Sequence, residues 1–456
     1  MTDSNTEHDA LSLSDRRFLW HPFTQMREWS REDPVIIEKG KGIYLWDTKG
    51  NRYFDGYSSL WVNLHGHCRE EIDRAVVDQL SRIAHSTFLG LSNVPAIRLA
   101  ERLIRIAPAG LTRVFYSDNG STAVEVGLKM AYQYWQHRGG KYRNKTKFVA
   151  LANAYHGDTV GTMSVGGIPL FQDRFRPLYY PTFKVDSPNC YRCPLSLTYP
   201  DCRIACADSV ESTLARHHSE IAALILEPGL QAAGGMVVHP RGYLERIREL
   251  ATRYDILLIL DEVATGFGRT GRMFACSHEK VSPDILAVAK GLTGGYLPLA
   301  ATLTTEAVYE AFLGHYDEFK TFFHGHSYTG NPLACAAAIA SLDLFEQENI
   351  LDQLQPKIAL MQELLYPFRE HPSVGDVRQA GWIGIIELVR EKKGKIPYPL
   401  SEKKGIAVCR EAGRRGLLIR PLGNVIAVVP PLCTSSAELR AMLEILMKSV
   451  EAAVPL

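Results

Sequence analysis

The sequence has 456 residues, with 51 Lys and Arg against 50 Asp and Glu, which gives a net charge of +1. This length exceeds that of a usual single domain, so we expect two domains with a sizeable core. The balanced charge provides no bulk attraction to nucleic acid or to an anionic membrane, and we expect neither as a partner. Residues 1–15 are polar and acidic, unlike a signal peptide, and no apolar run reaches the length of a membrane span. The sequence therefore predicts a cytoplasmic protein.

Two regions differ in the pattern of their apolar residues. Residues 35–57 predict short antiparallel strands with turns at 39–42 and 49–51. From about 80 to 340, apolar β-branched runs alternate with amphipathic stretches, which predicts an α/β fold with a mostly parallel sheet covered by helices. The clearest strands are Arg113–Tyr116, Lys147–Ala150, Ala222–Leu226, Ile256–Leu260 and Ile285–Ala289.

The domain organisation follows from these patterns. The last part, from about Ser341, predicts a helix, a strand and a second helix. We therefore expect a large domain at 80–340 and a small α+β domain, built from 1–79 and 341–456 at the two chain ends.

Two charged residues stand at the ends of apolar strands. Asp261 ends the run Ile256–Leu260 and is followed by a glycine-rich loop, and Lys290 ends the run Ile285–Ala289 before a second such loop. A lysine in a poorly hydrated pocket has a lowered pKa and becomes a nucleophile toward carbonyl groups. Each residue alone has another interpretation: Asp261 as a structural carboxylate or metal ligand, and Lys290 as a lysine that extends to solvent.

A third segment suits an anion. A strand leads into Gly120 and Ser121, and a helix is predicted from Ala123 to His137. The backbone amides and the Ser121 hydroxyl at this helix start could hold a phosphate, although a plain helix cap explains the segment equally. Farther along, Tyr155 and His156 follow a strand and offer an aromatic ring beside polar groups. The ring could stack on a flat heterocycle or serve only in packing.

These four features together match one cofactor, pyridoxal phosphate. Its chemistry needs a lysine to hold the aldehyde as a Schiff base and a carboxylate to keep the pyridine nitrogen protonated. It also needs a seat for the phosphate and a platform for the ring. We therefore expect catalytic roles for Lys290, Asp261 and Tyr155.

The order of the motifs resembles class III aminotransferases, which are pyridoxal-phosphate enzymes of fold type I. The sequence contains, in this order, S-D-N-G-S, N-A-Y-H-G-D, L-D-E-V-A-T-G-F-G-R-T-G, A-K-G-L-T-G-G and H-G-H-S-Y-T-G-N-P. The resemblance implies that the cofactor is bound by Gly120, Ser121, Tyr155, His156, Asp261 and Lys290. It also implies a homodimer with shared sites, in which His326 and Ser327 contact the partner's phosphate and Gly325 lies near the substrate.

Three further segments resemble the diaminopelargonate synthases, the branch of this class that acts in biotin synthesis. They are W-H-P-F-T-Q-M, Y-S-S-L-W-V-N-L-H-G and R-P-L-G-N, and in the last of them Arg420 matches an arginine that binds a substrate carboxylate. The resemblance implies transfer of an amino group to 8-amino-7-oxononanoate. A broad ω-transaminase that uses pyruvate and simple amines is the nearest alternative.

The amino donor depends on residues at which this sequence departs from relatives that use S-adenosylmethionine. Those relatives have a Tyr, a Trp pair and another Tyr where this chain has Phe23, Leu60 before Trp61, and Ala427. An adenine ring would lose partners for stacking and hydrogen bonding, whereas lysine needs a carboxylate site and room for its chain. We therefore expect the donor to be lysine or S-adenosylmethionine, with lysine preferred.

Four of the nine cysteines crowd into one stretch, with the spacing C-x2-C-x8-C-x3-C at Cys190, Cys193, Cys202 and Cys206. The interval between the pairs is shorter than in common zinc ribbons, and no histidine completes a familiar pattern. Reduced thiols in a surface excursion are the interpretation we favour, so no metal is expected. A metal-binding or phosphate-binding structural protein is the alternative of another class.

Overall fold

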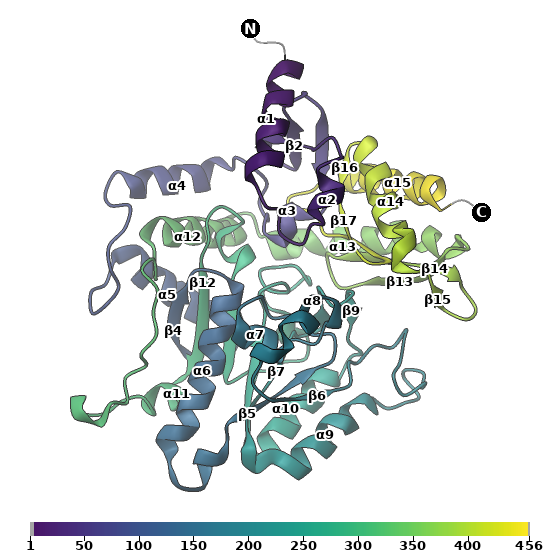
Figure 1. The fold of residues 1–456 in the computed structure, drawn as a ribbon. Coiled ribbons are helices and arrows are strands. Elements are labelled where there is room, and N and C mark those ends of the chain that lie inside the picture. The colour runs from purple at the N-terminus through teal and green to yellow at the C-terminus, as the bar shows by residue number, and fades with distance from the viewer. Residues whose placement is uncertain (1–3, 455–456) are drawn as a thin grey trace.

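A seven-stranded sheet lies at the centre of the large lower part of the molecule in the computed structural model, which describes residues 4–454 (Figure 1). In spatial order its strands are β4 (Leu111–Ser117), β12 (Ala300–Thr305), β11 (Ile285–Val288), β10 (Leu257–Asp261), β7 (Ile221–Leu226), β5 (Lys147–Leu151) and β6 (Thr182–Val185). All neighbours pair in parallel except β12, which is antiparallel to β4 and to β11. The predicted α/β fold with a mostly parallel sheet is confirmed.

Helices cover both faces of this sheet because its strands are apolar on both sides. Along β7, Ile225 packs in the cluster that contains helix α6 (Gly120–Arg138), whereas Leu224 and Leu226 pack in the cluster on the opposite face. All three side chains are fully buried, and each stabilises the fold by roughly 2 kcal/mol. The continuous apolar runs in the sequence follow from this two-sided burial.

The remaining helices have the following bounds. They are α1 (Ser4–Phe18), α2 (Met26–Trp29), α3 (Ser58–Trp61), α4 (Glu70–Leu80), α5 (Val94–Ile106), α7 (Val160–Val165), α8 (Pro169–Gln172), α9 (Cys206–His217), α10 (Tyr243–Arg253), α11 (Glu306–Glu310), α12 (Pro332–Gln347), α13 (Ile350–Leu365), α14 (Lys404–Arg414) and α15 (Ser436–Ala453). Among the helices of residues 4–454, none combines the length and the apolar character that crossing a membrane requires.

The five strands expected in the central region all form, within a residue or two of their expected ends. Two strands of the sheet, β6 and β12, were not among them. The antiparallel strands expected at 35–57 are also present, as β1 (Ile37–Lys41), β2 (Tyr44–Asp47) and β3 (Arg52–Asp55). The turn expected at 49–51 lies between β2 and β3, whereas most of the turn expected at 39–42 belongs to β1, so that turn is shorter than predicted.

The two chain ends share one sheet. Strand β16 (Leu417–Leu418) pairs in parallel with β3, so the order of this sheet is β1-β2-β3-β16. Farther along, the backbone N–H of Val429 donates to the carbonyl of Gly56. Helix α12 continues through position 340, the expected boundary between the domains, and the boundaries themselves stay a prediction.

The C-terminal part is richer in strands than the single one we expected. Its sheet has the order β13-β14-β18-β17, with β15 paired to β14. The bounds are β13 (Val374–Gln379), β14 (Gly384–Glu391), β15 (Ile396–Pro397), β17 (Arg420–Leu422) and β18 (Val425–Val428), and a separate pair is formed by β8 (Leu230–Gln231) and β9 (Val237–Val238). Helices α13, α14 and α15 complete this part, so the expected single strand was an underestimate.

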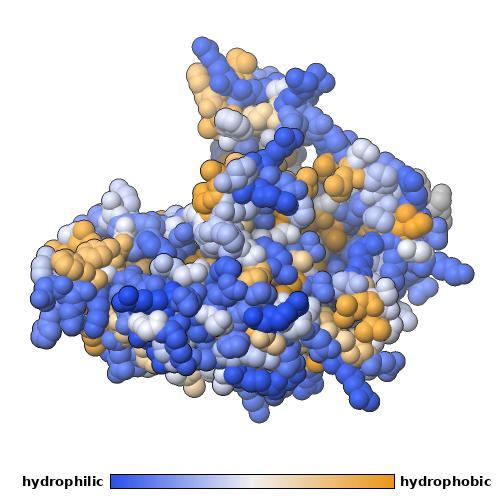
Figure 2. All heavy atoms as spheres, turned by 60° about the horizontal axis from the view of Figure 1, so that its bottom comes forward, coloured by the Kyte–Doolittle hydropathy of each residue, from blue (hydrophilic) through white to orange (hydrophobic). Residues whose placement is uncertain are grey.

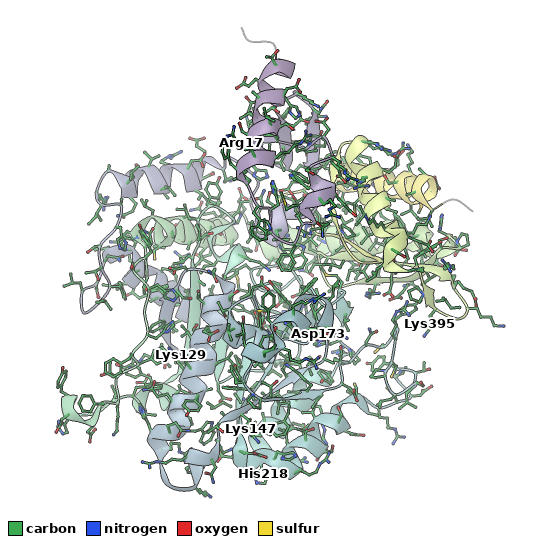
Figure 3. The ribbon with its side chains drawn as sticks, viewed as in Figure 1. Arg17, Lys129, Lys147, Asp173, His218 and Lys395 are labelled. Atoms are coloured by element: carbon green, nitrogen blue, oxygen red, sulfur yellow. The ribbon has the colours of Figure 1, made fainter. Side chains whose placement is uncertain are left out.

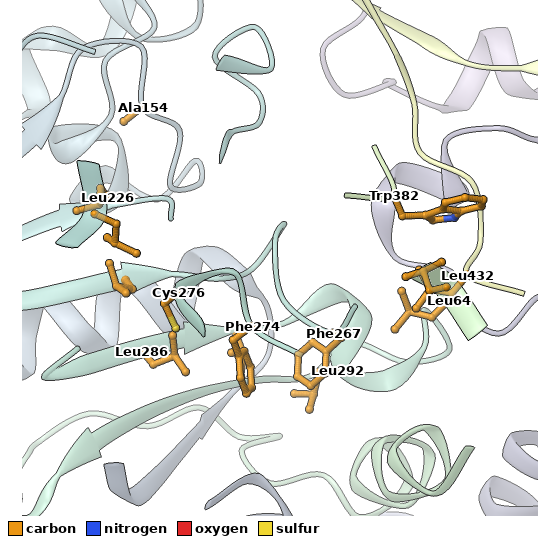
Figure 4. Packing of buried hydrophobic residues seen from close by; sticks show 14 of the residues in the cluster. Leu64, Ala154, Leu226, Phe267, Phe274, Cys276, Leu286, Leu292, Trp382 and Leu432 are labelled. Carbon is orange, nitrogen blue, oxygen red and sulfur yellow. The ribbon is translucent and has the colours of Figure 1, made fainter. Parts of the chain in front are cut away.

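One hydrophobic cluster extends from the central sheet into the C-terminal part. Figure 4 shows Leu226 and Leu286 of the sheet, Phe267 from the loop after β10, and Trp382 with Leu432 from the C-terminal part. The Trp382 indole donates to the carbonyl of Pro430 at 3.1 Å. On the face seen in Figure 2, charged and apolar residues are interspersed and the apolar ones gather in separate patches.

Candidate active site

A cavity of about 510 Å³ opens at the carboxyl ends of the parallel strands, where loops from both chain ends close over it. Such strand ends are where ligands of α/β proteins bind. Its wall includes ten of the residues expected at the site: Phe23, Leu60, Trp61, Gly120, Ser121, Tyr155, His156, Asp261, Lys290 and Arg420. Ala427, one of the positions that bear on the amino donor, also lines it. Folding thus brings residues from most of the chain length to one place.

Lys290 follows strand β11 and has a φ of 48°, in the left-handed region. Its Nζ lies 4.7 Å from the centroid of the Trp61 ring, so the amine faces the cavity beside an aromatic wall. Burial lowers the pKa of this half-buried amine, while the nearby carboxylates of Asp261 and Glu227 oppose that shift. A lysine with a lowered pKa supplies the neutral amine that attacks a carbonyl.

Asp261 ends strand β10 and is buried. Its Oδ2 accepts a hydrogen bond from His156 Nδ1 at 2.7 Å, and its Oδ1 accepts one from the backbone of Val263 at 3.0 Å. Each oxygen keeps a further lone pair, so the carboxylate can still accept a bond from a cationic ring nitrogen. Among the described residues, His156 Nε2 is a buried atom without a hydrogen-bond partner. The Asp261 carboxylate and His156 Nε2 can therefore form hydrogen bonds with a ligand in addition to those within the chain.

The start of helix α6 has the features of a phosphate seat. Asn119 caps the helix by accepting from the backbone of Thr122 at 3.1 Å, which leaves the N–H groups of Gly120 and Ser121 at the cavity wall. A Cβ on Gly120 would lie 2.6 Å from Cγ1 of Val263, so this close approach requires glycine. The segment is thus a helix cap and an anion site at once, and the two interpretations of the sequence do not exclude each other.

Tyr155 is held at both ends. Its hydroxyl donates to Asp158 Oδ2 at 2.7 Å, and its backbone N–H donates to Glu227 Oε1 at 3.2 Å. Its ring lies edge-on to Phe171 with the centroids 6.4 Å apart, and Phe171 in turn lies 5.2 Å from Phe23. These three rings form an aromatic row across one wall of the cavity.

Glu227 is a site residue that the sequence reasoning missed. It follows strand β7, is buried, and accepts backbone bonds from Tyr155 and from Ala232 at 2.8 Å. Burial raises the pKa of its carboxyl group to about 8, and the charge of Asp261 adds to the shift. The sequence does contain a signal for Glu227: it is a carboxylate directly after a buried strand, which is the pattern that identified Asp261. Phe171 and Asp118 also line the cavity, and the sequence did not predict either of them as a site residue.

The wall formed by the chain ends is strained. Ser58, Ser59, Leu60 and Trp61 all have φ between 48° and 72°, a left-handed turn that costs roughly 1–2 kcal/mol per residue. Asp55 holds this turn by accepting from the backbone and the hydroxyl of Ser59, at 2.8 and 2.9 Å. Strain of this kind concentrates at functional sites, and here it places Leu60 and Trp61 in the wall.

Gly325, His326 and Ser327 are not brought to the cavity of their own chain. His326 Nδ1 lies 2.6 Å from Asp118 Oδ2, and Asp118 lines the cavity, so the segment packs behind the phosphate seat. The contact of these residues with a partner's phosphate stays a prediction.

The nine cysteines are all free thiols. Among the residues that the structure describes, no three His, Cys, Asp or Glu side chains are already arranged to hold a metal ion.

Comparison with known proteins agrees with this geometry. The family model described as aminotransferase class-III matches residues 26–450. The chain belongs to the class-III aminotransferases, and it is therefore an aminotransferase of a family that uses pyridoxal phosphate.

Among individual relatives, the chain is 53% identical over 447 residues to the adenosylmethionine-8-amino-7-oxononanoate aminotransferase of Geobacter sulfurreducens, covering 97% of this chain and 98% of that one. The crystal structure of the Methanocaldococcus jannaschii protein of the same name is 45% identical with a TM-score of 0.93, over 98% of this chain and 99% of the other. The ω-transaminase of Pseudomonas jessenii in complex with PMP is 33% identical with a TM-score of 0.92, over 97% and 98% of the two chains.

Proposed function

We propose that this aminotransferase transfers an amino group to 8-amino-7-oxononanoate and forms 7,8-diaminononanoate, a step of biotin biosynthesis. The observation that carries the proposal is 53% identity over nearly the full length of a relative named for this acceptor. Trp61 and Arg420, whose segments resemble those of this branch, line the cavity and so can contact the substrate.

Pyridoxal phosphate fits the residues present. Lys290 would hold it, Gly120 and Ser121 would seat its phosphate, Tyr155 and His156 would lie beside its ring, and Asp261 would pair with the ring nitrogen. When bound, the cofactor supplies the electron sink that stabilises negative charge on the substrate carbon. The Lys290 amine then takes a proton from the carbon that bears the donor amine, and it returns a proton in the reverse half.

A covalent label tests the lysine. Purified protein is expected to be yellow, and borohydride is expected to fix the cofactor on a single peptide that contains Lys290. Peptide mapping checks this result by mass spectrometry. A labelled peptide that excludes Lys290 would refute the assignment, whatever the acceptor is.

The substrate side of the cavity has fewer fixed partners. Arg420 would bind a carboxylate of the substrate, and Phe23, Leu60, Trp61 and Tyr155 would line its chain, with Gly325 contributed by the partner subunit. An ω-transaminase is the competing function, because the Pseudomonas jessenii enzyme has nearly the same fold. Assays with 8-amino-7-oxononanoate and with pyruvate as acceptors separate the two. Turnover with pyruvate alone would favour the ω-transaminase.

The preferred donor is proposed to be lysine. The relatives are named for adenosylmethionine, but three positions that would meet a large sulfonium donor carry Phe23, Leu60 and Ala427, and all three line the cavity. They offer neither a hydroxyl group nor an indole to an adenine ring.

Half-reactions decide the donor without a coupled assay. The yellow enzyme is mixed with each donor separately, and loss of its colour reports amino transfer to the cofactor. Lysine is expected to convert the enzyme, and adenosylmethionine to act poorly. Efficient conversion by adenosylmethionine with none by lysine would overturn the donor proposal and leave the acceptor untouched.

The proposed assembly is a cytoplasmic homodimer in which His326 and Ser327 reach the partner's phosphate. Residues 325–327 do not line the cavity of their own chain, which leaves them available to a partner's site and supports this arrangement. Sedimentation of the holoenzyme is expected to give a dimer as the active species. A fully active monomer would contradict shared sites.

A further inference from the structure

The segment between β6 and α9 forms turns and bends but no helix or strand. Cys190, Cys193 and Cys202 lie in this segment, and Cys206 begins α9. All four residues line one small cavity of about 20 Å³, which shares no lining residue with the large cavity. A turn-rich segment of this length has little regular hydrogen bonding of its own to hold it in place.

The cavity has the size and the chemistry of a metal site. Its volume is close to that of one water molecule or one small ion. The rest of its wall is mostly apolar: Pro188, Pro194, Leu195, Leu197, Ala205 and Pro240, with Asn189 and Tyr199. Thiols are weak hydrogen-bonding groups, so a water there would have poor partners. Thiolates are strong ligands for zinc, and both cysteine pairs have spacings that structural zinc sites use.

We propose that Cys190, Cys193, Cys202 and Cys206 hold one Zn²⁺ as a structural site. The sequence alone favours reduced thiols over a metal site. Folding brings all four cysteines to one cavity, and this convergence favours the metal site. On binding, the four thiols release four protons and bind the ion as thiolates, without a change of oxidation state. No three of these side chains are already in a metal-binding arrangement in the described chain, so the proposed site requires the segment to close around the ion.

The site would brace the C-terminal part of the protein. The two residues between the first cysteine pair are the ones that dock there: Arg192 Nε donates to Glu387 Oε1 at 2.7 Å, and Lys395 Nζ donates to the carbonyl of Tyr191 at 2.7 Å. Figure 3 shows Lys395 at the margin of the C-terminal part, above this segment. Binding of Cys190 and Cys193 to the ion would therefore hold Tyr191 and Arg192 in position against the C-terminal part.

A chain of hydrogen bonds links Glu387 to the region of the large cavity. Glu387 also accepts from Arg378 Nη1 at 2.9 Å, and Arg378 Nη2 donates to the carbonyl of Gly235 at 2.7 Å. Gly235 lies two residues after Ala233, which is part of the wall of the active site. Loss of the zinc is thus expected to lower the melting temperature of the whole chain by several degrees rather than to abolish the cofactor site.

Metal analysis of the full-length protein, purified without chelators, tests the proposal. About one zinc per chain is expected in the wild type and in Cys68→Ser, whose thiol lies outside the cluster. Cys193→Ser and Cys202→Ser are expected to contain far less. A wild-type protein that carries no zinc and takes up none from micromolar Zn²⁺ would overturn the proposal.

A second measurement needs no variant. Thiols that react with Ellman's reagent are counted in the native protein before and after removal of the metal by a strong chelator, and the count is expected to rise by four. An unchanged count, or peptide mapping that finds these cysteines in disulfides, would overturn the site. Neither readout depends on amino transfer, so failure here leaves the proposed function standing.

Discussion

The two halves of the large cavity are built in different ways. In the strand-end half, Asp261, Glu227 and Lys290 each come at the end of a buried parallel strand, and the hydrogen bonds of the sheet fix their spacing. In the chain-end half, Leu60 and Trp61 come from a strained left-handed turn and line the cavity together with Arg420 from the opposite end of the sequence.

This difference suggests that the strand-end half carries out the chemistry and that the chain-end half selects the substrate. The Pseudomonas jessenii ω-transaminase and the Methanocaldococcus jannaschii relative match this fold almost equally well, although their names differ. A rigid sheet edge can therefore serve one cofactor in many enzymes, while the loops at the chain ends vary with the substrate. Changes in the strand-end half should lower turnover for every substrate, and changes in the chain-end half should act on particular substrates.

The largest effect is expected for Lys290→Ala. Removing the amine takes away both the covalent anchor and the proton carrier, so turnover should fall by about 10⁴-fold with either donor. Single-turnover kinetics measure this fall, and Lys393→Ala, at an exposed position, serves as the control. If the variant kept even a tenth of the activity, the strand-end half would not contain the chemistry.

The next largest effect is expected for Asp261→Asn. The amide keeps the shape of the side chain but removes the charge that holds a ring nitrogen protonated, so turnover should fall by about 10²–10³-fold while the fold survives. Circular dichroism checks the fold, and Asp173→Asn on the surface is the matched control. Near-normal turnover in a folded variant would contradict the role of Asp261.

A pH-dependent effect is expected from Glu227. Its folded-state pKa of about 8 lies above the ordinary value of 4.5, so between these values the folded chain binds a proton that the unfolded chain has lost. Stability from this group is complete below pH 4.5 and is lost as the pH rises through about 8. In the cofactor-free protein, the free energy of unfolding should fall less with rising pH in Glu227→Gln than in the wild type, by roughly 1–3 kcal/mol.

Urea unfolding at pH 6 and pH 9 measures this difference, with the exposed Glu245→Gln as control. Glu227→Gln is expected to be less stable than the wild type at pH 6, because one backbone bond is lost, and to close that gap at pH 9. Parallel curves for the two proteins would show that Glu227 is ionised throughout.

The sequence predicted the strand-end half better than the rest, for physical reasons. Asp261 and Lys290 could be found because a charge at the end of a continuous apolar run is conspicuous. Strand β12 could not, because it reads A-A-T-L-T-T and its buried hydroxyls are satisfied only after folding: Thr302 donates to the carbonyl of Ala123, and Thr304 to that of Asp284. Polar residues at buried positions hide a strand from any pattern of hydrophobicity.

Phe171 escaped prediction for a related reason. It lies in the four-residue helix α8, and nothing in its local sequence separates it from Phe175, which is a few residues away and half exposed. Only the folded chain places its ring between Tyr155 and Phe23. The residues of the chain-end wall are thus brought together by tertiary contacts that no short motif records.

The smallest effect is expected for Phe171→Ala, and it tests the boundary between the two halves. Phe171 touches Tyr155 on the cofactor side and Phe23 on the substrate side, so its loss should loosen both rings without removing a reacting group. Aromatic pairs of this kind are worth about 0.5–1.5 kcal/mol, which predicts a rise in KM of roughly threefold to tenfold with kcat nearly unchanged. Steady-state kinetics with each donor measure the split, Phe171→Leu should recover part of the loss, and Phe175→Ala is the control because it lies outside the cavity. If kcat falls as far as it does in Asp261→Asn, Phe171 belongs to the strand-end half and the division between chemistry and selectivity lies farther toward the chain ends.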